Sequence, residues 1–225
     1  MRRAIRDNGL SLFFLALFLL ALLGQSVAGY LRNDGELTDH GMPRIGFVEF
    51  VTSSDFLVDV AENWQSEFLQ FFLFIAATIW LVQRGSPESK RPGDEGPGSD
   101  ADQLVGDHAR PDSPRWASLG GLRTVLYGNS LLIVMGAVFV LSWFAQSLAG
   151  TVVMNSENAM HGAPSVTWLD YVVSSDFWDR TLQNWQSEFL AVGTMVAFSI
   201  YLRQRGSAES KPVGEPDQVS STESE

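Results

Sequence analysis

Two glutamates and two glutamines stand at the ends of long apolar stretches in this sequence. Glu67 and Glu188 each precede an apolar run, and Gln25 and Gln146 each lie at the end of another. A carboxylate inside a membrane is costly and normally faces a polar interior or a water-filled cavity, where it can bind a proton or a cation. With their polar neighbours, these residues form a candidate intramembrane polar site: Gln25, Ser26, Asn63, Glu67, Gln146, Ser147, Asn184 and Glu188.

Two interpretations of this site are open. In the first, the site binds or conducts a small cation, a proton or a polar solute. In the second, the polar side chains are hydrogen-bond glue that fixes the register of packed helices, and the protein has a structural or accessory role. Asn63 and Glu67 are four residues apart and share one helix face under either interpretation, as do Asn184 and Glu188.

Catalysis is the third and weakest interpretation. The chain has no cysteine, which excludes disulfides, thiolate metal sites and cysteine nucleophiles. An enzyme could use the loop residues His40, Asp55, His161 and Asp176. Neither His40 nor His161 has a second ligand at a metal-type spacing, and no phosphate-binding loop, nucleophile elbow or zinc-protease motif is present. We therefore expect no enzyme activity, no cofactor and no metal site.

The elements that carry these residues are duplicated. Residues 8–90 (the first copy) align without a gap with residues 129–211 (the second copy), and 35 of the 83 aligned pairs are identical. Such self-similarity indicates two equivalent structural units. The longest identical stretch, Asn-Trp-Gln-Ser-Glu-Phe-Leu, occupies residues 63–69 and 184–190. Each copy should therefore hold two apolar helices joined by a polar loop.

Each copy should cross a membrane twice. The first apolar run of each copy covers about 20 residues, or ~30 Å of helix, which matches the hydrocarbon thickness of a bilayer. The second run is shorter, but interfacial anchors flank it: Trp64 with Arg84, and Trp185 with Arg205. The predicted spans are residues 9–29, 63–83, 130–150 and 184–204.

These spans predict an all-α integral membrane protein with four transmembrane helices, arranged as two tandem parallel-repeat hairpins. The outer loops, residues 43–52 and 164–173, carry aromatic and aliphatic residues, so each should contain a short interfacial or re-entrant helix. Ser54-Asp55 and Ser175-Asp176 resemble helix starts, with a capping hydroxyl and a carboxylate in the first turn.

The distribution of lysine and arginine predicts the orientation. Of the 15 basic residues, 12 precede the first span, follow the last span or lie between the copies, which places both termini in the cytoplasm. Gln25 and Glu67 should then share one depth, ~25 Å from the cytoplasmic interface. A cleaved signal peptide is the alternative for the first run, because Ser26-Val27-Ala28 resembles a cleavage site. The equivalent run in mid-chain favours a retained helix.

The predicted parts of the chain are a first hairpin (1–84), a linker (85–122), a second hairpin (123–205) and a tail (206–225). Linker and tail are rich in polar, glycine and proline residues, so we expect both to be disordered in the cytoplasm. The net charge of −11 argues against nucleic-acid binding. The expected partners are the lipid bilayer and either a second copy of the chain or another membrane protein.

The repeated stretch at 63–69 and 184–190, together with the Gln-Arg-Gly-Ser-x-Glu-Ser-Lys ends at 83–90 and 204–211, resembles a family of small bacterial membrane proteins with no assigned function. The resemblance covers nearly the whole chain outside the linker and tail. It implies a bacterial plasma membrane and a four-helix layout, and it implies no activity or substrate.

Overall fold

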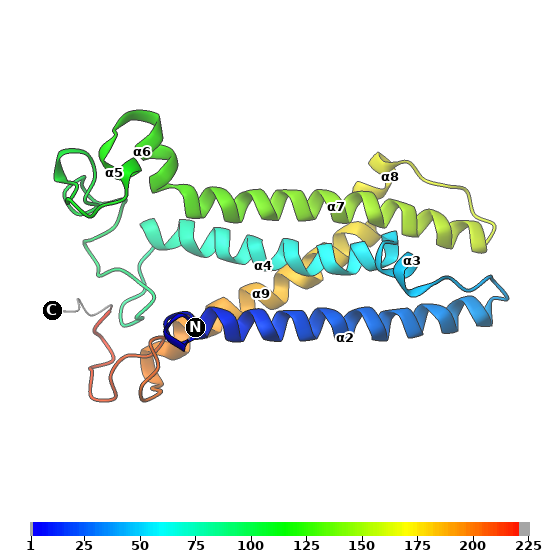
Figure 1. Ribbon diagram of the computed structural model, residues 1–225, viewed down its shortest axis with the longest axis horizontal. Helices are drawn as coiled ribbons and strands as arrows, with labels where there is room; N and C mark the ends of the chain where they lie inside the picture. The colour runs from blue at the N-terminus through cyan, green and yellow to red at the C-terminus, as the bar shows by residue number, and fades with distance from the viewer. Residues whose placement is uncertain (1, 221–225) are drawn as a thin grey trace. The chain divides into compact units, whose positions relative to one another are not determined.

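The computed structural model describes residues 2–220 and shows a helical protein (Figure 1). No strand occurs among these residues, which confirms the predicted all-α class. Met1 and residues 221–225, the end of the predicted tail, lie outside the described part of the chain.

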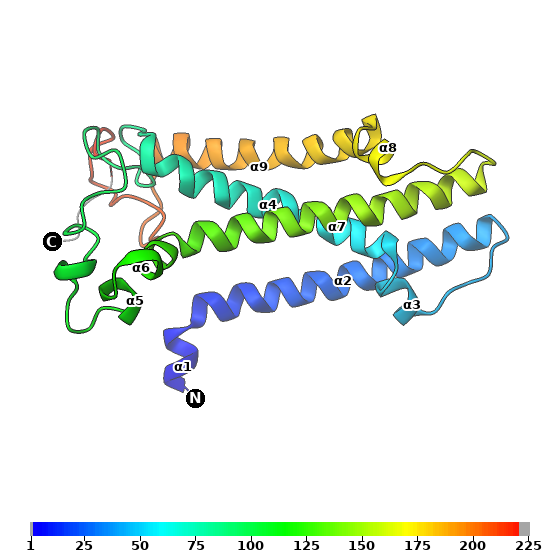
Figure 2. The ribbon, with the colours of Figure 1, turned by 90° about the horizontal axis from the view of Figure 1, so that it is seen from above.

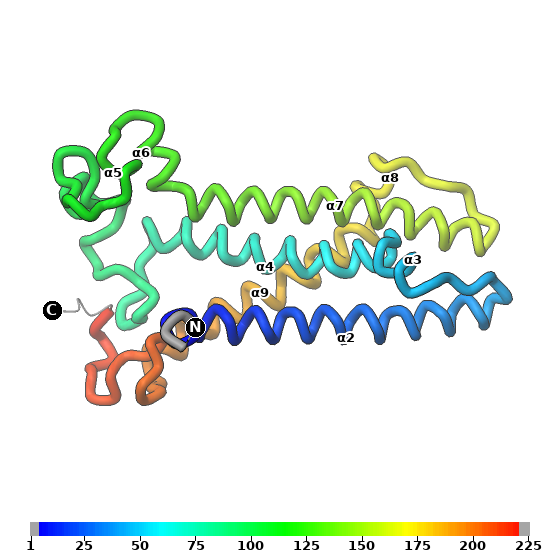
Figure 3. The backbone as a smooth tube through the Cα atoms, in the orientation of Figure 1, coloured from blue at the N-terminus to red at the C-terminus, as the bar shows by residue number. Residues whose placement is uncertain are grey.

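Each copy contains the same three helices. The first copy has α2 (Gly9–Asp39), α3 (Phe47–Val51) and α4 (Ser54–Trp80). The second copy has α7 (Ser130–Met160), α8 (Trp168–Val172) and α9 (Ser175–Tyr201). Corresponding helices have equal lengths of 31, 5 and 27 residues. A short helix is therefore present in each loop, as predicted, and its place at or in a membrane stays a prediction. The tube in Figure 3 shows the chain turning after α2 and coming back to α3.

Short elements lie outside the copies or between them. They are α1 (Arg2–Asp7), η1 (Gly106–His108), α5 (Arg115–Ser118) and α6 (Gly121–Gly128). The predicted disorder of linker and tail stays a prediction, although the turns that follow α4 and α9 are closed by hydrogen bonds, as described below.

Two helices, α2 and α7, are long and apolar enough to cross a membrane. Only 6% of the most apolar window of α2 and 17% of that of α7 is buried, whereas a core helix of a soluble protein would be mostly buried. α4 and α9 do not meet the same criterion, because polar residues lower the mean hydropathy of even their most apolar parts. In α4 these include Asn63, Gln65, Glu67 and Gln70. The four predicted spans are therefore only partly confirmed.

The helix ends differ from the predicted span ends. α4 ends at Trp80 and α9 at Tyr201, before the predicted limits of 83 and 204. The backbone N–H of Gln83 donates to Ser89 Oγ at 2.7 Å, and that of Gln204 donates to Ser210 Oγ at 2.8 Å, so both segments bend into turns at this point. α2 and α7 instead continue to Asp39 and Met160, well beyond the apolar runs.

The chain forms two compact units that do not coincide with the copies. Unit 1 contains Met1–Ala61 and Ala145–Val172, and unit 2 contains Glu62–Phe144 and Val173–Glu225. Each unit includes parts of both copies, because α4 and α7 pass from one unit to the other. The domain boundaries predicted at 84, 122 and 205 stay a prediction.

Glycines let the short helices pack closely in unit 1. Phe50 of α3 and Tyr171 of α8 are each only 1% exposed. A Cβ added at Gly29 of α2 would lie 2.9 Å from the Phe50 ring, and one at Gly150 of α7 would lie within 2.2 Å of the Tyr171 hydroxyl. Gly29 and Gly150 are equivalent residues, so both copies make this contact in the same way.

The N-termini of α4 and α9 are capped by serine, one residue before the predicted position. The backbone N–H of Phe56 donates to Ser53 Oγ at 3.3 Å, and that of Phe177 donates to Ser174 Oγ at 3.2 Å. The helices themselves begin at Ser54 and Ser175, as the sequence predicts. The cap lies earlier because the capping residue precedes the first helical residue.

Candidate functional site

The eight residues of the predicted polar site lie on four helices. Gln25 and Ser26 lie on α2, and Gln146 and Ser147 on α7, all in unit 1. Asn63 and Glu67 lie on α4, and Asn184 and Glu188 on α9, all in unit 2. The depth that Gln25 and Glu67 are predicted to share concerns both units and stays a prediction.

In unit 1 the polar residues support local packing. The buried Ser26 donates through Oγ to the carbonyl oxygen of Leu22 at 2.8 Å. The indole Nε1 of Trp168 donates to Ser147 Oγ at 2.9 Å, which ties α8 to α7. Gln146, next to Ser147, is fully buried. These contacts match the second interpretation, in which polar side chains fix the register of helices.

In unit 2 two polar contacts join α4 to α9, and so join the two copies. Arg180 Nε donates to Glu62 Oε1 at 2.5 Å, and Trp185 Nε1 donates to Gln65 Oε1 at 2.7 Å. Gln65 is fully buried. In the alignment Arg180 corresponds to Asp59, and Glu62 corresponds to Gln183, so the ion pair has no mirror-image counterpart. The copies have diverged into complementary surfaces here.

The carboxyl groups of Glu67 and Glu188 lie within electrostatic range of each other. They are equivalent residues of the two copies. Proximity of equivalent residues is typical of two units related by a two-fold axis. Glu67 is exposed and Glu188 is half-buried, so the pair is accessible from outside the protein.

One face of α4 is buried at the level of the predicted polar site. Gln65, Ser66 and Leu69 are buried and Glu62 is half-buried, and their spacing is that of one helix face. Asn63 and Glu67 share the neighbouring, exposed face. The helical spacing of residues 62, 65, 66 and 69 is the sequence signal that could have predicted the burial of Gln65. Gln65 lies inside the stretch that is identical in both copies.

The two predicted tryptophan anchors have different surroundings. Trp64 is 40% exposed, as an interfacial anchor should be. Trp185 is half-buried and lies against Trp143, with ring centroids 5.7 Å apart. Trp143 in turn packs on other rings of unit 2, namely Phe139, Phe177 and Trp178. The predicted arginine anchors, Arg84 and Arg205, are exposed in the turns beyond the helix ends.

The turns that follow α4 and α9 lie side by side (Figures 1 and 2). The carboxyl groups of Glu88 and of Glu209, its equivalent in the second copy, lie within electrostatic range of each other. Burial first, and then the neighbouring Glu209, raise the pKa of the Glu88 carboxyl. Equivalent residues are thus close together here as well as at Glu67 and Glu188.

The tail is fastened to the first of these turns by one lysine. Lys211 is only 4% exposed, and its Nζ donates to the carbonyl oxygen of Gly85 at 2.6 Å and to that of Asp217 at 3.0 Å, with further bonds to Pro216 and Val219. Burial first, and then the neighbouring Arg203, lower the pKa of the Lys211 ammonium. Sequence composition gave no signal for this contact.

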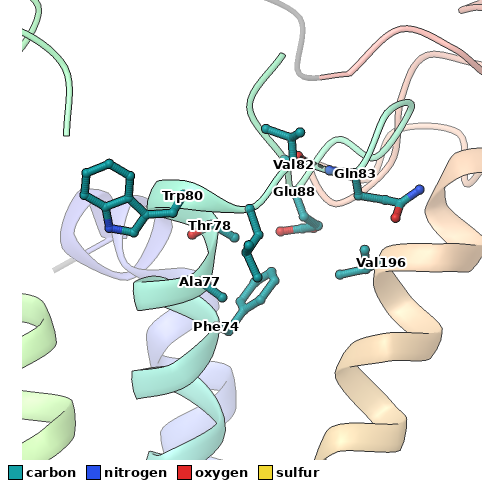
Figure 4. Close-up of a pocket in the computed structure, with 10 residues that line it drawn as sticks. Phe74, Ala77, Thr78, Trp80, Val82, Gln83, Glu88 and Val196 are labelled. Carbon is teal, nitrogen blue, oxygen red and sulfur yellow. Dashed lines mark hydrogen bonds between the residues drawn. The ribbon is translucent and has the colours of Figure 1, made fainter. Parts of the chain in front are cut away.

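A cavity of ≈ 590 Å³ lies between the end of α4 and α9 (Figure 4). Phe74 of α4 contributes an aromatic wall and Val196 of α9 lies opposite it, while the indole of Trp80 points to the other side of the end of α4. Glu88 projects its carboxyl group into the space between α4 and Val196. The cavity is therefore mainly apolar with an acidic group at one side.

A second cavity, of ≈ 290 Å³, lies within unit 1 and is lined by His40 and Asp55 with Glu36 and Glu157. The structure thus brings together two of the four residues considered for catalysis, while Asp176 belongs to unit 2. His40 Nδ1 lies 2.8 Å from the carbonyl oxygen of Glu36. Among the described residues, no group of three or more histidine and acidic side chains is arranged to hold a metal ion.

Comparisons with known proteins give a family and no activity. Neither the search of curated proteins nor the search of solved structures found a match. One family model matches residues 1–222, which is nearly the whole chain. The chain therefore belongs to the family described as "Domain of unknown function (DUF6766)".

Proposed function

We propose that the chain is a bacterial plasma-membrane protein whose two copies form four spans, with both termini in the cytoplasm. The sparse burial of α2 and α7 supports two of these spans. The other two spans are supported by the equal lengths of α4 and α9 and by their exposed apolar residues. Phe71 and Leu190, for example, are 48% and 67% exposed. The excess of basic residues outside the loops of the hairpins supports the orientation.

Cysteine labelling distinguishes four spans from two, because the natural chain contains no cysteine. Single variants Ser99→Cys and His161→Cys are treated with a membrane-impermeant maleimide in spheroplasts. With four spans, position 161 reacts at once and position 99 reacts only after lysis. If only α2 and α7 crossed the membrane, the pattern would be reversed.

The function we propose is binding or conduction of a proton or a small cation by Glu67 and Glu188. The observation that carries it is the electrostatic proximity of these two equivalent carboxyl groups. Two carboxylates that face each other repel unless a proton or a cation lies between them. Such a pair in or near a membrane marks an ion-binding position.

Flux in proteoliposomes tests the proposal. The chain is reconstituted with an internal pH-sensitive dye, and a proton or Na⁺ gradient is imposed. The double variant Glu67→Gln/Glu188→Gln should abolish flux and keep the melting temperature of the natural chain. Glu36→Gln is the matched control, because Glu36 is exposed and pairs only loosely with Arg32, at 3.8 Å. Absence of flux in the natural chain would refute conduction.

A structural or accessory role is the second candidate, and specific contacts favour it. The Trp185–Gln65 and Trp168–Ser147 hydrogen bonds use polar side chains to fix helices. In that case the chain acts by binding a second copy or another membrane protein, and the double glutamine variant would lower the melting temperature without affecting any flux. We propose no catalytic activity, because no recognisable catalytic motif is present.

A further inference from the structure

The cavity between the end of α4 and α9 has the size and lining of a small-molecule site. Its volume of ≈ 590 Å³ is within the range of about 300–1,000 Å³ that is usual for ligand pockets. Most of its lining is apolar, including Phe74, Leu81 and Val196. The indole of Trp80 is 63% exposed and stands at the edge of the cavity (Figure 4).

The charge of the cavity comes from one carboxyl group. Glu88 projects its carboxyl group into the cavity and is the charged residue among those that line it. An ionised Glu88 therefore gives the cavity one negative charge. The lysines of the same turns are engaged elsewhere, since Lys90 Nζ donates to the Gly96 carbonyl and Lys211 Nζ to the Gly85 carbonyl.

A single negative charge beside aromatic and aliphatic walls is complementary to one class of ligand. A monovalent organic cation places its apolar groups against the walls and its charge near the Glu88 carboxyl group. A lipid acyl chain would fill the apolar part and leave the charge of Glu88 uncompensated.

We propose that this cavity binds a lipophilic organic cation, such as a quaternary ammonium or phosphonium compound, with Glu88 as the anionic contact and Phe74 as an aromatic wall. The site is separate from Glu67 and Glu188, so it stands whether or not those residues carry an ion.

Equilibrium dialysis of the detergent-solubilised full chain against radiolabelled tetraphenylphosphonium tests this proposal. We expect saturable binding of one cation per chain, weaker by about tenfold in Glu88→Gln, which corresponds to about 1.4 kcal/mol. Phe74→Ala should also weaken binding. Glu95→Gln is the matched control, since Glu95 is an exposed linker residue away from the cavity lining, and it should bind as the natural chain does.

Competition with neutral triphenylphosphine oxide supplies the second measurement. We expect it to compete poorly, because it lacks the charge. Equal binding of the neutral and cationic compounds, or unchanged affinity in Glu88→Gln, would overturn the proposal and indicate a site for a lipid chain. Melting temperatures of all variants are measured alongside, and if Glu88→Gln fails to fold, unchanged affinity in Phe74→Ala overturns the proposal.

Discussion

The ion pair between Glu62 and Arg180 provides a sharp test of how the copies meet. The contact is 2.5 Å long, and the side chains are only 13% and 36% exposed. A charge-assisted hydrogen bond with this degree of burial contributes about 2 kcal/mol. Glu62→Gln should therefore lower the melting temperature in detergent by about 5 °C, followed by circular dichroism.

Swapping the charges of Glu62 and Arg180 distinguishes the loss of this ion pair from the loss of a polar side chain alone. Glu62→Arg should cost more than Glu62→Gln, because two cations then face each other. The double variant Glu62→Arg/Arg180→Glu should recover most of the loss, to within about 1 kcal/mol of the natural chain.

The matched control is Arg32→Gln, which breaks the looser Arg32–Asp59 pair at 3.6 Å and should cost under about 1 kcal/mol. If the exchange variant were as unstable as Glu62→Arg, the α4–α9 contact would be refuted.

Three further predictions concern packing, pH and the tail. Gly150→Ala should lower the melting temperature, because the added methyl group would clash with the Tyr171 ring of α8. Gly35→Ala, which has open space around it, should raise the free energy of unfolding by about 1 kcal/mol through higher helix propensity. The raised pKa of Glu88 stabilises the fold at low pH, and this stabilisation is lost as pH rises through the folded-state pKa. Glu88→Gln should therefore gain stability relative to the natural chain as pH rises above 4.5, in melting experiments. Lys211→Met should make the tail more sensitive to limited proteolysis than Lys90→Met does, because the Lys211 ammonium hydrogen-bonds four carbonyl oxygens. Mass spectrometry of the fragments measures the difference.

Much of the helix layout could be predicted from the sequence. Apolar runs locate α2 and α7, and the self-alignment predicts that α4 and α9 match. The extension of α2 to Asp39 could not be predicted, because residues 30–39 are polar and carry no apolar periodicity.

The site was predicted less well than the helices. The sequence indicates how far along its helix Glu67 lies, but it does not indicate which helix face packs against a neighbour. The face that packs carries the buried Gln65. The contacts of Glu88 and Lys211 join residues over a hundred positions apart, at turns whose composition resembles that of flexible linkers. No local pattern encodes such pairings.

Crosslinking at Glu67 and Glu188 tests most directly whether the two copies bring these carboxyl groups together. In the cysteine-free chain, Glu67→Cys/Glu188→Cys is treated in native membranes with a short bismaleimide, and the linker is then cut at an inserted protease site. The two halves should stay joined on a denaturing gel, while each single-cysteine variant should separate into two fragments. Separation of the halves in the double variant, at full modification of both cysteines, would contradict a proton- or cation-binding pair at this position.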